Sequence, residues 1–233
     1  MPNNIYLIPT VLAADTQHDH LAPIIKDIVS NTKVYWVEDI RTARRYISSL
    51  RLGLVIEDLI FEVLNKKTSI SEVHSFFKKY AKEDIGIISE AGCPGIADPG
   101  SLAVKVAHEK NIPVIPLPGP SSIFMALMGS GLNGQRFTFN GYIPINLSER
   151  KKEIKRLESL ALNGTTQIFM ETPYRNNQLM KDLIAHCHGD TMLSISCNIS
   201  APNELVKTKR IKDWNSRLPD LHKLPTIFLL NQN

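Results

Sequence analysis

One stretch of the chain, from Ile85 to Pro120, limits the possible folds more than any other. Two short apolar runs, IGIIS and IPVIPL, each end in a loop rich in Gly, Pro and Ser, and a segment with a helical pattern joins them. This order is typical of a βαβ unit with parallel strands. Ligands bind outside the carboxyl ends of such strands, where Gly lets the main chain approach a ligand and Pro fixes its direction. The two loops therefore predict a small-molecule pocket built largely from main chain.

The rest of the first half repeats this alternation of strand and helix. Strands are predicted at 5–9 and 34–38. Helical patterns lie at about 21–29, 41–50, 69–81 and 102–109. The spacing of Ser69 and Glu72 matches a capping box at the start of the third helix. Alternation of this kind predicts an α/β unit, with a parallel sheet between two layers of helices.

The second half has a different order of elements. Helices are predicted at 121–128, 147–162, 174–187 and, more briefly, 213–217, and strands at 137–142, 166–171, 191–197, 204–211 and 225–230. Consecutive strands with short connections favour antiparallel pairing, so this sheet is expected to be mixed. The Pro-rich segment at 116–119 marks a boundary between an N-terminal domain, 1–117, and a C-terminal domain, 118–233.

Composition excludes few classes of function, but it favours a cytoplasmic location. The net charge of +4 permits a polyanionic partner without requiring one. The cysteines show no CxxC spacing, and their odd number argues against a disulfide framework. The N-terminus lacks the pattern of a signal peptide, and no apolar run is long enough for a membrane span. A cytoplasmic protein without membrane segments is expected.

Two loops are the strongest candidates for a ligand site. The loop at 89–100 contains three glycines and two prolines, and offers bare main-chain groups to a zwitterionic or nucleoside ligand. It could also be a structural connection in which Asp98 caps the following helix. The segment at 118–122 precedes a helix, whose first N–H groups suit a carboxylate or phosphate. Alternatively, Ser121 or Ser122 is an ordinary N-cap.

Charged residues follow two other strands. Glu38, Asp39 and Arg41 could orient a ribose hydroxyl or bind a phosphate, or they could simply suit the start of a helix. Glu171 and Arg175 could line a cleft, or could serve as a cap and surface charge.

Other motifs carry weaker signals. Gly129-x-Gly131-x-x-Gly134 has the letters of a dinucleotide fingerprint, but a helical run precedes it and a strand-like run follows it, the reverse of what that fold needs. His186, Cys187 and His188 point in different directions on a helix, so no metal is expected. The basic runs at 149–156 and 207–210 fit either a solvated surface or contact with nucleic acid.

Taken in order, these motifs resemble the tetrapyrrole-methylase superfamily of S-adenosylmethionine-dependent methyltransferases. The resemblance is closest to the branch that 2′-O-methylates a cytidine of small-subunit ribosomal RNA. It rests on YLIPT (6–10), VEDIRTARR (37–45), SEAGCPGIADPG (89–100), PLPGPSS (116–122), FTFNGYIP (137–144) and FMETPYR (169–175). In place of the Gly-Asn loop that this branch carries after its first strand, the chain reads VLAADTQ (11–17).

The resemblance implies two αβα domains, a homodimer, and S-adenosylmethionine bound in the cleft between the domains. The implied cofactor-binding residues are Ser89, Glu90, Ala91, Gly92, Pro94, Pro118, Gly119, Ser121, Ser122, Phe169, Met170, Glu171, Asn198 and Ala201. Ribosomal RNA is the implied substrate. A small-molecule acceptor such as a corrinoid precursor, and a non-catalytic RNA- or nucleotide-binding homologue, remain alternatives.

Methylation of a ribose hydroxyl needs a proton acceptor at or after the transfer. Glu38, Asp39 and Glu171 are the candidates for this role, while Arg41 and Arg175 suit phosphate better.

Overall fold

The apolar runs of the first half form a parallel sheet. In the computed structural model, which describes residues 3–214 and 218–232, its strands are β1 (Ile5–Ile8), β2 (Val34–Val37), β3 (Ile60–Val63), β4 (Ile85–Ile88) and β5 (Val114–Pro116). Their order across the sheet is β3-β2-β4-β1-β5, and every pairing is parallel. The βαβ unit predicted from β4 to β5 is present, although β1 lies between its two strands.

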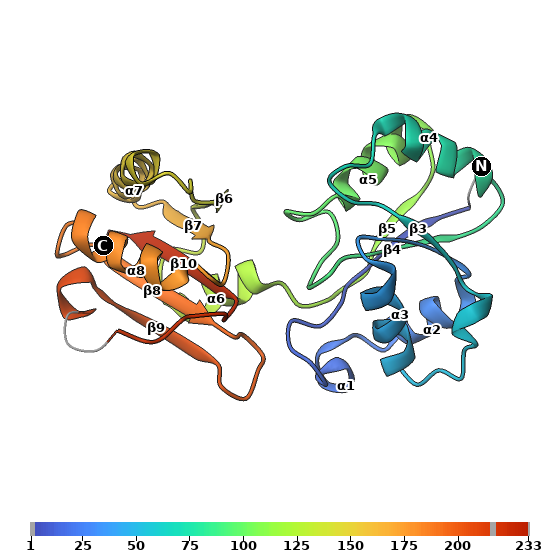
Figure 1. Cartoon of the computed structure of the whole chain (residues 1–233), viewed down its shortest axis with the longest axis horizontal. Coiled ribbons are helices and arrows are strands. Elements are labelled where there is room, and N and C mark those ends of the chain that lie inside the picture. Colours follow the sequence, from blue (N-terminus) through green and yellow to red (C-terminus); the bar gives the residue numbers. More distant parts are fainter. Residues whose placement is uncertain (1–2, 215–217, 233) are drawn as a thin grey trace. The chain divides into compact units, whose positions relative to one another are not determined.

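Helices cover both faces of this sheet, as Figure 1 shows. They are α1 (Gln17–His20), α2 (Ile24–Asn31), α3 (Ile40–Ser49), α4 (Ile70–Lys79) and α5 (Gly100–Glu109), with a 3₁₀ turn at Ile56–Asp58. Successive side chains of a strand point to opposite faces. In β2, Trp36 therefore packs in the cluster under α4 and α5, and Tyr35 in the cluster under α2 and α3. The capping box predicted at Ser69 and Glu72 is formed.

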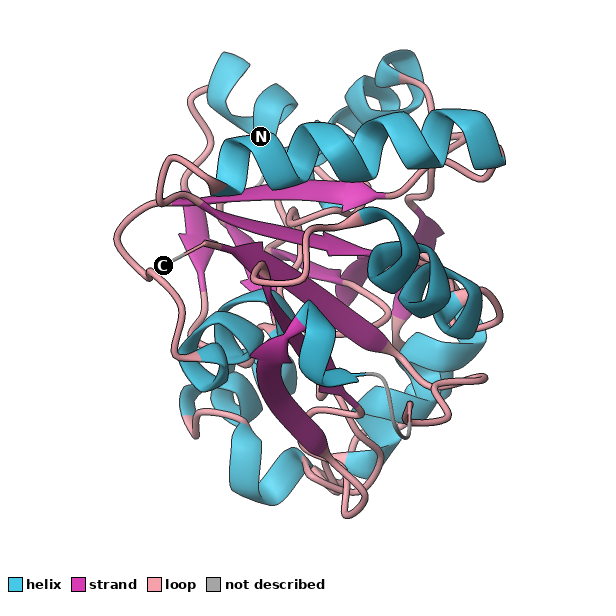
Figure 2. Ribbon diagram, turned by 90° about the vertical axis from the view of Figure 1, so that its left-hand side faces the viewer, coloured by secondary structure: helices cyan, strands magenta, loops and turns pink. Residues whose placement is uncertain are grey.

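The second half forms a mixed sheet, as predicted. Its strands are β6 (Phe137–Tyr142), β7 (Thr166–Met170), β8 (Met192–Cys197), β9 (Leu205–Arg210) and β10 (Thr226–Asn231), in the order β6-β7-β10-β8-β9. β6 and β7 pair in parallel, and the other pairs are antiparallel. The accompanying helices are α6 (Ser122–Ser130), α7 (Leu147–Ala161) and α8 (Asn176–His186), and Figure 2 shows the strands with the helices that flank them.

A short helix was predicted at 213–217. Within the described residues a 3₁₀ turn at Ile211–Trp214 occupies the start of this segment, and residues 215–217 lie outside them.

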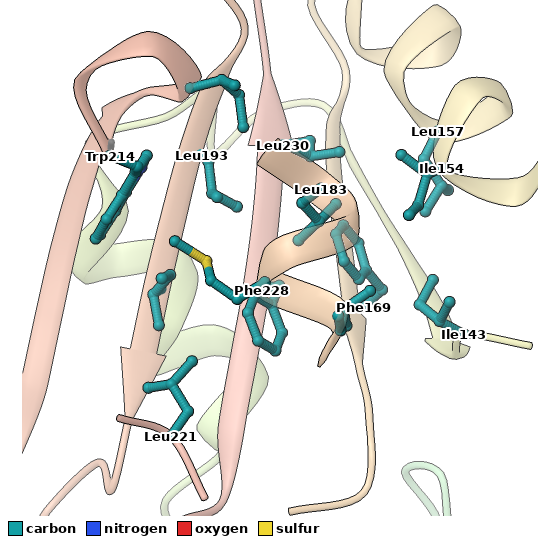
Figure 3. Packing of buried hydrophobic residues seen from close by; sticks show 14 of the residues in the cluster. Ile143, Ile154, Leu157, Phe169, Leu183, Leu193, Trp214, Leu221, Phe228 and Leu230 are labelled. Carbon is teal, nitrogen blue, oxygen red and sulfur yellow. The ribbon is translucent and has the colours of Figure 1, made fainter. Parts of the chain in front are cut away.

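The core of the second unit lies between the mixed sheet, α7 and α8. Phe169 and Phe228, on neighbouring strands, stack with their ring centroids 6.0 Å apart, and Leu183 of α8 belongs to the same cluster (Figure 3). Because side chains alternate along a strand, Ile227 and Leu229 face the other side of the sheet, on which α6 packs.

The chain divides into two compact units, residues 1–121 and 122–233, each with its own sheet and core. The domain boundary expected from the Pro-rich segment, between 117 and 118, falls in the same connection between β5 and α6 as this division.

Candidate active site

The loops at the carboxyl ends of β1, β4 and β5 are joined to one another. The N–H of Thr10 donates to Gly92 O at 2.9 Å, and Thr10 Oγ1 donates to Ser89 O at 3.3 Å. The Cys93 thiol donates to Pro120 O at 3.4 Å, which links the loop after β4 to the loop after β5. All three loops leave the sheet at one edge because the strands are parallel. The structure thus brings together the two loops predicted to bind a ligand and adds the loop after β1.

Glycine is favoured at two positions in these loops, for different reasons. Gly92 has a φ of +74°, a conformation that glycine adopts readily and other residues rarely do. A Cβ added to Gly119 would overlap the ring of Pro9 in the loop after β1. Contact between two loops therefore explains the glycine at 119, whereas the sequence suggested space for a ligand.

Acidic side chains follow β2 and β4 at the same edge. Burial raises the pKa of Glu38, and the negative charges of Asp98 and Glu90 raise it further. Burial also raises the pKa of Glu90, with a contribution from the charge of Asp39. Glu38 and Glu90 are therefore better proton acceptors than ordinary carboxylates, provided that they are ionised at the working pH.

Asp39 has a structural task at the start of α3. Its Oδ1 accepts the N–H of Thr42 at 2.8 Å and the hydroxyl of Thr42 at 3.2 Å. The hydrogen bond from the Thr42 N–H is the main reason why the pKa of Asp39 lies below its ordinary value. The helix-cap alternative is therefore correct for Asp39, whose lowered pKa makes it a weak base. Arg41 is exposed in the first turn of α3.

A cavity of about 360 Å³ opens between the loop after β1, α3 and the loop after β4. The Tyr46 hydroxyl, in its wall, donates to Pro9 O at 2.8 Å and so fastens α3 to the loop after β1. Side chains from all three elements line the cavity, among them Val11, Leu12, Thr42, Tyr46, Glu90 and Ala91. The site thus has a preformed, mostly apolar recess next to the main-chain loops.

In the second unit, Glu171 is held by Arg175 in a loop at the end of β7. Arg175 Nε and Nη2 donate to the two carboxylate oxygens at 2.8 and 2.6 Å, and the Thr172 N–H donates at 2.5 Å. Burial raises the pKa of Glu171, but the hydrogen bonds from Arg175 and Thr172 outweigh burial, so its pKa lies below the ordinary value. A carboxylate engaged in this way is a poor general base. The structure therefore disfavours Glu171 as a proton acceptor, and two of the three guanidinium nitrogens of Arg175 are engaged with Glu171.

Asn198 and Ala201 lie in the loop after β8, at the same edge of the mixed sheet as Glu171. This follows because β7 and β8 both run antiparallel to β10. Asn198 has a φ of +49°, and its Nδ2 donates to Asn203 Oδ1 at 3.1 Å.

Phe169 and Met170, also expected at the cofactor, occupy the last two positions of β7. The Phe169 side chain is fully buried in the core, so any contact it makes with a ligand is through its main chain, whereas Met170 is half-buried.

The expected cofactor residues fall into two groups, one in each unit. The first group lies in the loops after β4 and β5: Ser89, Glu90, Ala91, Gly92, Pro94, Pro118, Gly119 and Ser121. The second lies at the start of α6, the end of β7 and the loop after β8: Ser122, Phe169, Met170, Glu171, Asn198 and Ala201. Their roles remain predictions.

The sequence did not lead us to predict that α3 forms one wall of the cavity. Thr42, Arg45, Tyr46 and Ser49 of α3 all line it, at spacings of three or four residues that place them on one helix face. The spacing is visible in the sequence, but it is equally typical of a solvated helix.

Two of the weaker motifs can be compared with the structure. Gly129 lies in the last turn of α6, and β6 follows Gly134, so the motif has a helix before it and a strand after it, the reverse of a dinucleotide site. Among residues 3–214 and 218–232, no group of three or more His, Cys, Asp or Glu side chains is placed to hold a metal ion. In this same part of the chain, no helix combines the length and the apolar character needed to cross a membrane.

A family model described as the tetrapyrrole (corrin/porphyrin) methylases matches residues 18–214. The chain belongs to this family. Its members are S-adenosylmethionine-dependent methyltransferases, so the expected family, enzyme class and cofactor are confirmed.

Several curated relatives carry the name "Ribosomal RNA small subunit methyltransferase I". The protein of Xylella fastidiosa is 30% identical over 182 residues, which make up 78% of this chain and 63% of the relative. The protein of Buchnera aphidicola subsp. Acyrthosiphon pisum is 27% identical over 215 residues, 90% of this chain and 72% of the relative. For the protein of Synechocystis, the match covers 43% of the relative's length. The chain thus spans less than two thirds of several of the relatives that it matches.

Two solved structures share the fold at low sequence identity. The methyltransferase CobJ superposes with a TM-score of 0.65 at 14% identity, covering 98% of this chain and 93% of its own. Uroporphyrin-III-C-methyltransferase from Thermus thermophilus gives 0.59 at 15% identity, covering 99% and 94%. These likenesses confirm the α/β architecture with two sheets.

Proposed function

We propose that the chain transfers a methyl group from S-adenosylmethionine to a ribose 2′-hydroxyl of small-subunit ribosomal RNA. One observation carries the proposal: relatives named for this RNA match up to 90% of the chain, across both of its units. The motifs at 37–45 and 89–100, on which the resemblance to the 2′-O-methylating branch rests, support the ribose as acceptor.

The residues present fit this cofactor. S-adenosylmethionine carries a sulfonium, an ammonium, a carboxylate and ribose hydroxyls, and it supplies an electrophilic methyl carbon. Glu90 and the main chain of 89–94 offer acceptors for the cationic groups and hydroxyls. The segment 118–122 leads into α6, whose first N–H groups suit a carboxylate. We place the cofactor against these two loops; the expected contributions of 169–171 and 198–201, in the second unit, stay predictions.

The protein's contribution to the reaction is to hold the acceptor hydroxyl in line and to remove its proton. Positioning of this kind can supply roughly 7–11 kcal/mol of the barrier. Glu38 is the proposed proton acceptor, because its pKa is raised whereas those of Asp39 and Glu171 are lowered. Bound S-adenosylmethionine would supply the methyl group and keep the electron pair of the broken bond on its sulfur, and Glu38 would take the proton of the acceptor hydroxyl.

A homodimer in the cytoplasm is part of the same proposal. Phe124 and Phe137 are exposed in this chain, and their rings meet edge to face with centroids 5.9 Å apart. Met128, one turn further along α6, is 82% exposed. A second copy could cover this apolar surface, and light scattering with Met128→Glu against wild type tests whether it does.

Two measurements test the activity. We expect calorimetric titration to show S-adenosylmethionine binding at one site per chain. With radiolabelled cofactor, label should then enter small-subunit RNA at a 2′-hydroxyl. Absence of cofactor binding, or label entering only a tetrapyrrole precursor and not RNA, would overturn the proposal.

The variant Glu38→Gln tests the proton acceptor. Loss of a general base is expected to lower kcat by about 10²–10⁴-fold while cofactor affinity stays unchanged. An unchanged kcat would remove Glu38 from the mechanism and leave Glu90 as the next candidate.

A further inference from the structure

Two aromatic side chains meet at one edge of the mixed sheet. Tyr174 lies in the loop after β7, and His222 lies in the segment that leads into β10. Their ring centroids are 6.2 Å apart, and their planes meet edge to face at 74°. Tyr174 is 69% exposed, and His222 is exposed as well. The pair therefore presents aromatic surface to solvent rather than to the core.

Hydrogen bonds fix the two segments that carry these rings. The Lys223 N–H donates to Pro173 O at 3.0 Å, and so joins the segment before β10 to the loop after β7. On α8, Asn177 Oδ1 accepts the N–H of Leu221 at 2.7 Å, and Asn177 Nδ2 donates to Asp220 Oδ1 at 2.7 Å. The side chain of Leu221 is fully buried in the core. The rings are thus carried by backbone that is ordered before a ligand binds, which lowers the entropic cost of binding.

The same edge of the sheet carries the residues of the second unit that are expected at the cofactor. Because β7 and β8 run antiparallel to β10, the ends of β7 and β8 and the start of β10 lie at one edge. The N–H of Asn198 donates to Pro225 O at 2.9 Å, which joins the loop after β8 to the segment before β10. In the loop after β7, Tyr174 lies between Glu171 and Arg175, which form an ion pair. The two rings therefore border the expected cofactor residues of this unit without being among them.

The charge beside the rings suits a polyanion. Lys223 follows His222 in the chain, is exposed, and forms no ion pair among residues 3–214 and 218–232. The neighbouring carboxylate of Asp220 accepts hydrogen bonds from the Asn177 side chain and the His222 N–H instead. Single-stranded nucleic acids bind where bases can stack on aromatic rings and cations can reach the phosphates. Both features are present at this edge.

We propose that Tyr174 and His222 form a stacking platform for an unpaired base of the RNA, with Lys223 on an adjoining phosphate. The assignment rests on the proposed function, and it adds a contact with a nucleotide other than the methyl acceptor. Every base has a face that can stack on an aromatic ring, so the contact requires a single strand but no particular sequence. In duplex RNA the base faces are covered by neighbouring base pairs, so a duplex cannot use the platform.

Two variants of one residue test the platform. Tyr174→Leu removes the ring and keeps an apolar side chain, whereas Tyr174→Phe keeps the ring. Fluorescence anisotropy measures their binding to a labelled single-stranded RNA of about twelve nucleotides. We expect Tyr174→Leu to weaken binding at least about fivefold, as for the loss of one stacked base, and Tyr174→Phe to bind like wild type.

Duplex RNA of the same sequence is the control ligand, which wild type and Tyr174→Leu should bind equally. The proposal is overturned if wild type does not bind the single strand, if Tyr174→Leu binds it like wild type, or if its affinity falls equally for single strand and duplex.

Variants of the two neighbours test the rest of the assignment. His222→Ala should weaken binding of the single strand, and its effect should be smaller when Tyr174→Leu is already present, because the two rings serve one base. Losses that multiply in the double variant would contradict a paired platform. Lys223→Gln should reduce the dependence of binding on salt concentration, whereas Lys105→Gln, at an exposed position of α5 in the first unit, should not. Equal effects of the two lysine variants would contradict the phosphate contact.

Calorimetry and light scattering separate the other possible occupants of the platform. Tyr174→Leu should bind S-adenosylmethionine with the affinity of wild type and keep the molar mass of wild type. Loss of cofactor affinity would assign the rings to the adenine of the cofactor, and a lower molar mass would assign them to contact between two copies; either result overturns the proposal. If wild type binds single-stranded RNA but does not bind S-adenosylmethionine, the proposed function fails, and the comparison of Tyr174→Leu with Tyr174→Phe still decides the platform.

Discussion

At the scale of single residues, the acidic side chains near the two sheet edges differ in their partners. Glu38, which is half-buried, and Glu90, which is exposed, both lie near other carboxylates, and both have raised pKa values. Asp39 and Glu171 accept main-chain or guanidinium N–H groups, and both have lowered pKa values. Residue type and sequence position do not distinguish these pairs, because each acid follows a strand. Their surroundings distinguish the candidate proton acceptors from Asp39, which caps a helix, and from Glu171, which is held in a loop by Arg175.

The pairing of Glu171 predicts a pH-dependent stability. Its pKa is lowered in the folded chain, so its stabilising effect is complete above the ordinary value of 4.5 and is lost as the pH falls through the folded value. Glu171→Gln should therefore lower the free energy of unfolding by roughly 1–2 kcal/mol at pH 7. The difference from wild type should shrink below about pH 4.5.

Urea titrations between pH 3 and pH 7 measure this difference. Glu57→Gln, at an exposed position, is the control for removal of a carboxylate as such. A difference between Glu171→Gln and wild type that stays constant down to pH 3 would contradict the stabilising ion pair.

At the scale of elements, a buried ion pair joins α7 to α8. Arg150 Nε donates to Asp182 Oδ2 at 2.6 Å, and the two side chains are 8% and 9% exposed. Removal of one partner leaves an uncompensated buried charge, so Asp182→Ala should cost about 3–5 kcal/mol of stability. Glu153→Ala, which breaks a pair on the same helix with Arg156 (52% exposed), should cost less than about 1 kcal/mol. Urea unfolding of the two variants measures both values, and similar costs would contradict the role of burial.

The elements also show what the sequence can and cannot predict. Strong periodicity and turn residues gave the parallel sheet, the mixed sheet and the capping box. The edge strand β3 was not predicted from the sequence. Its side chains are half-buried or exposed, and Glu62 within it pairs with Lys79 on α4, so it lacks the apolar pattern of a buried strand. The loops after β4 and β5 were recognisable from Gly and Pro. Their contact with the loop after β1, through Pro9 and Gly119, depends on the strand order, which no local pattern contains.

At the scale of the whole molecule, each unit holds one tryptophan in its own core. Trp36 lies in the first unit, where it meets the ring of Phe77 with centroids 4.7 Å apart, and Trp214 lies in the core of the second. The three buried clusters share no residue across the division at 121 and 122. Because the apolar burial that stabilises each unit is its own, we expect the units to unfold separately.

Single-tryptophan variants make this expectation measurable. With Trp36→Phe as background, Phe228→Ala should lower the stability reported by Trp214 fluorescence by about 3–5 kcal/mol, the usual cost of removing a buried ring. With Trp214→Phe as background, the same substitution should leave the transition reported by Trp36 unchanged. The reciprocal variant Phe77→Ala should act on Trp36 and not on Trp214. If either substitution shifts both transitions together, the two units form one cooperative structure, and the energetic independence inferred from their separate cores is wrong.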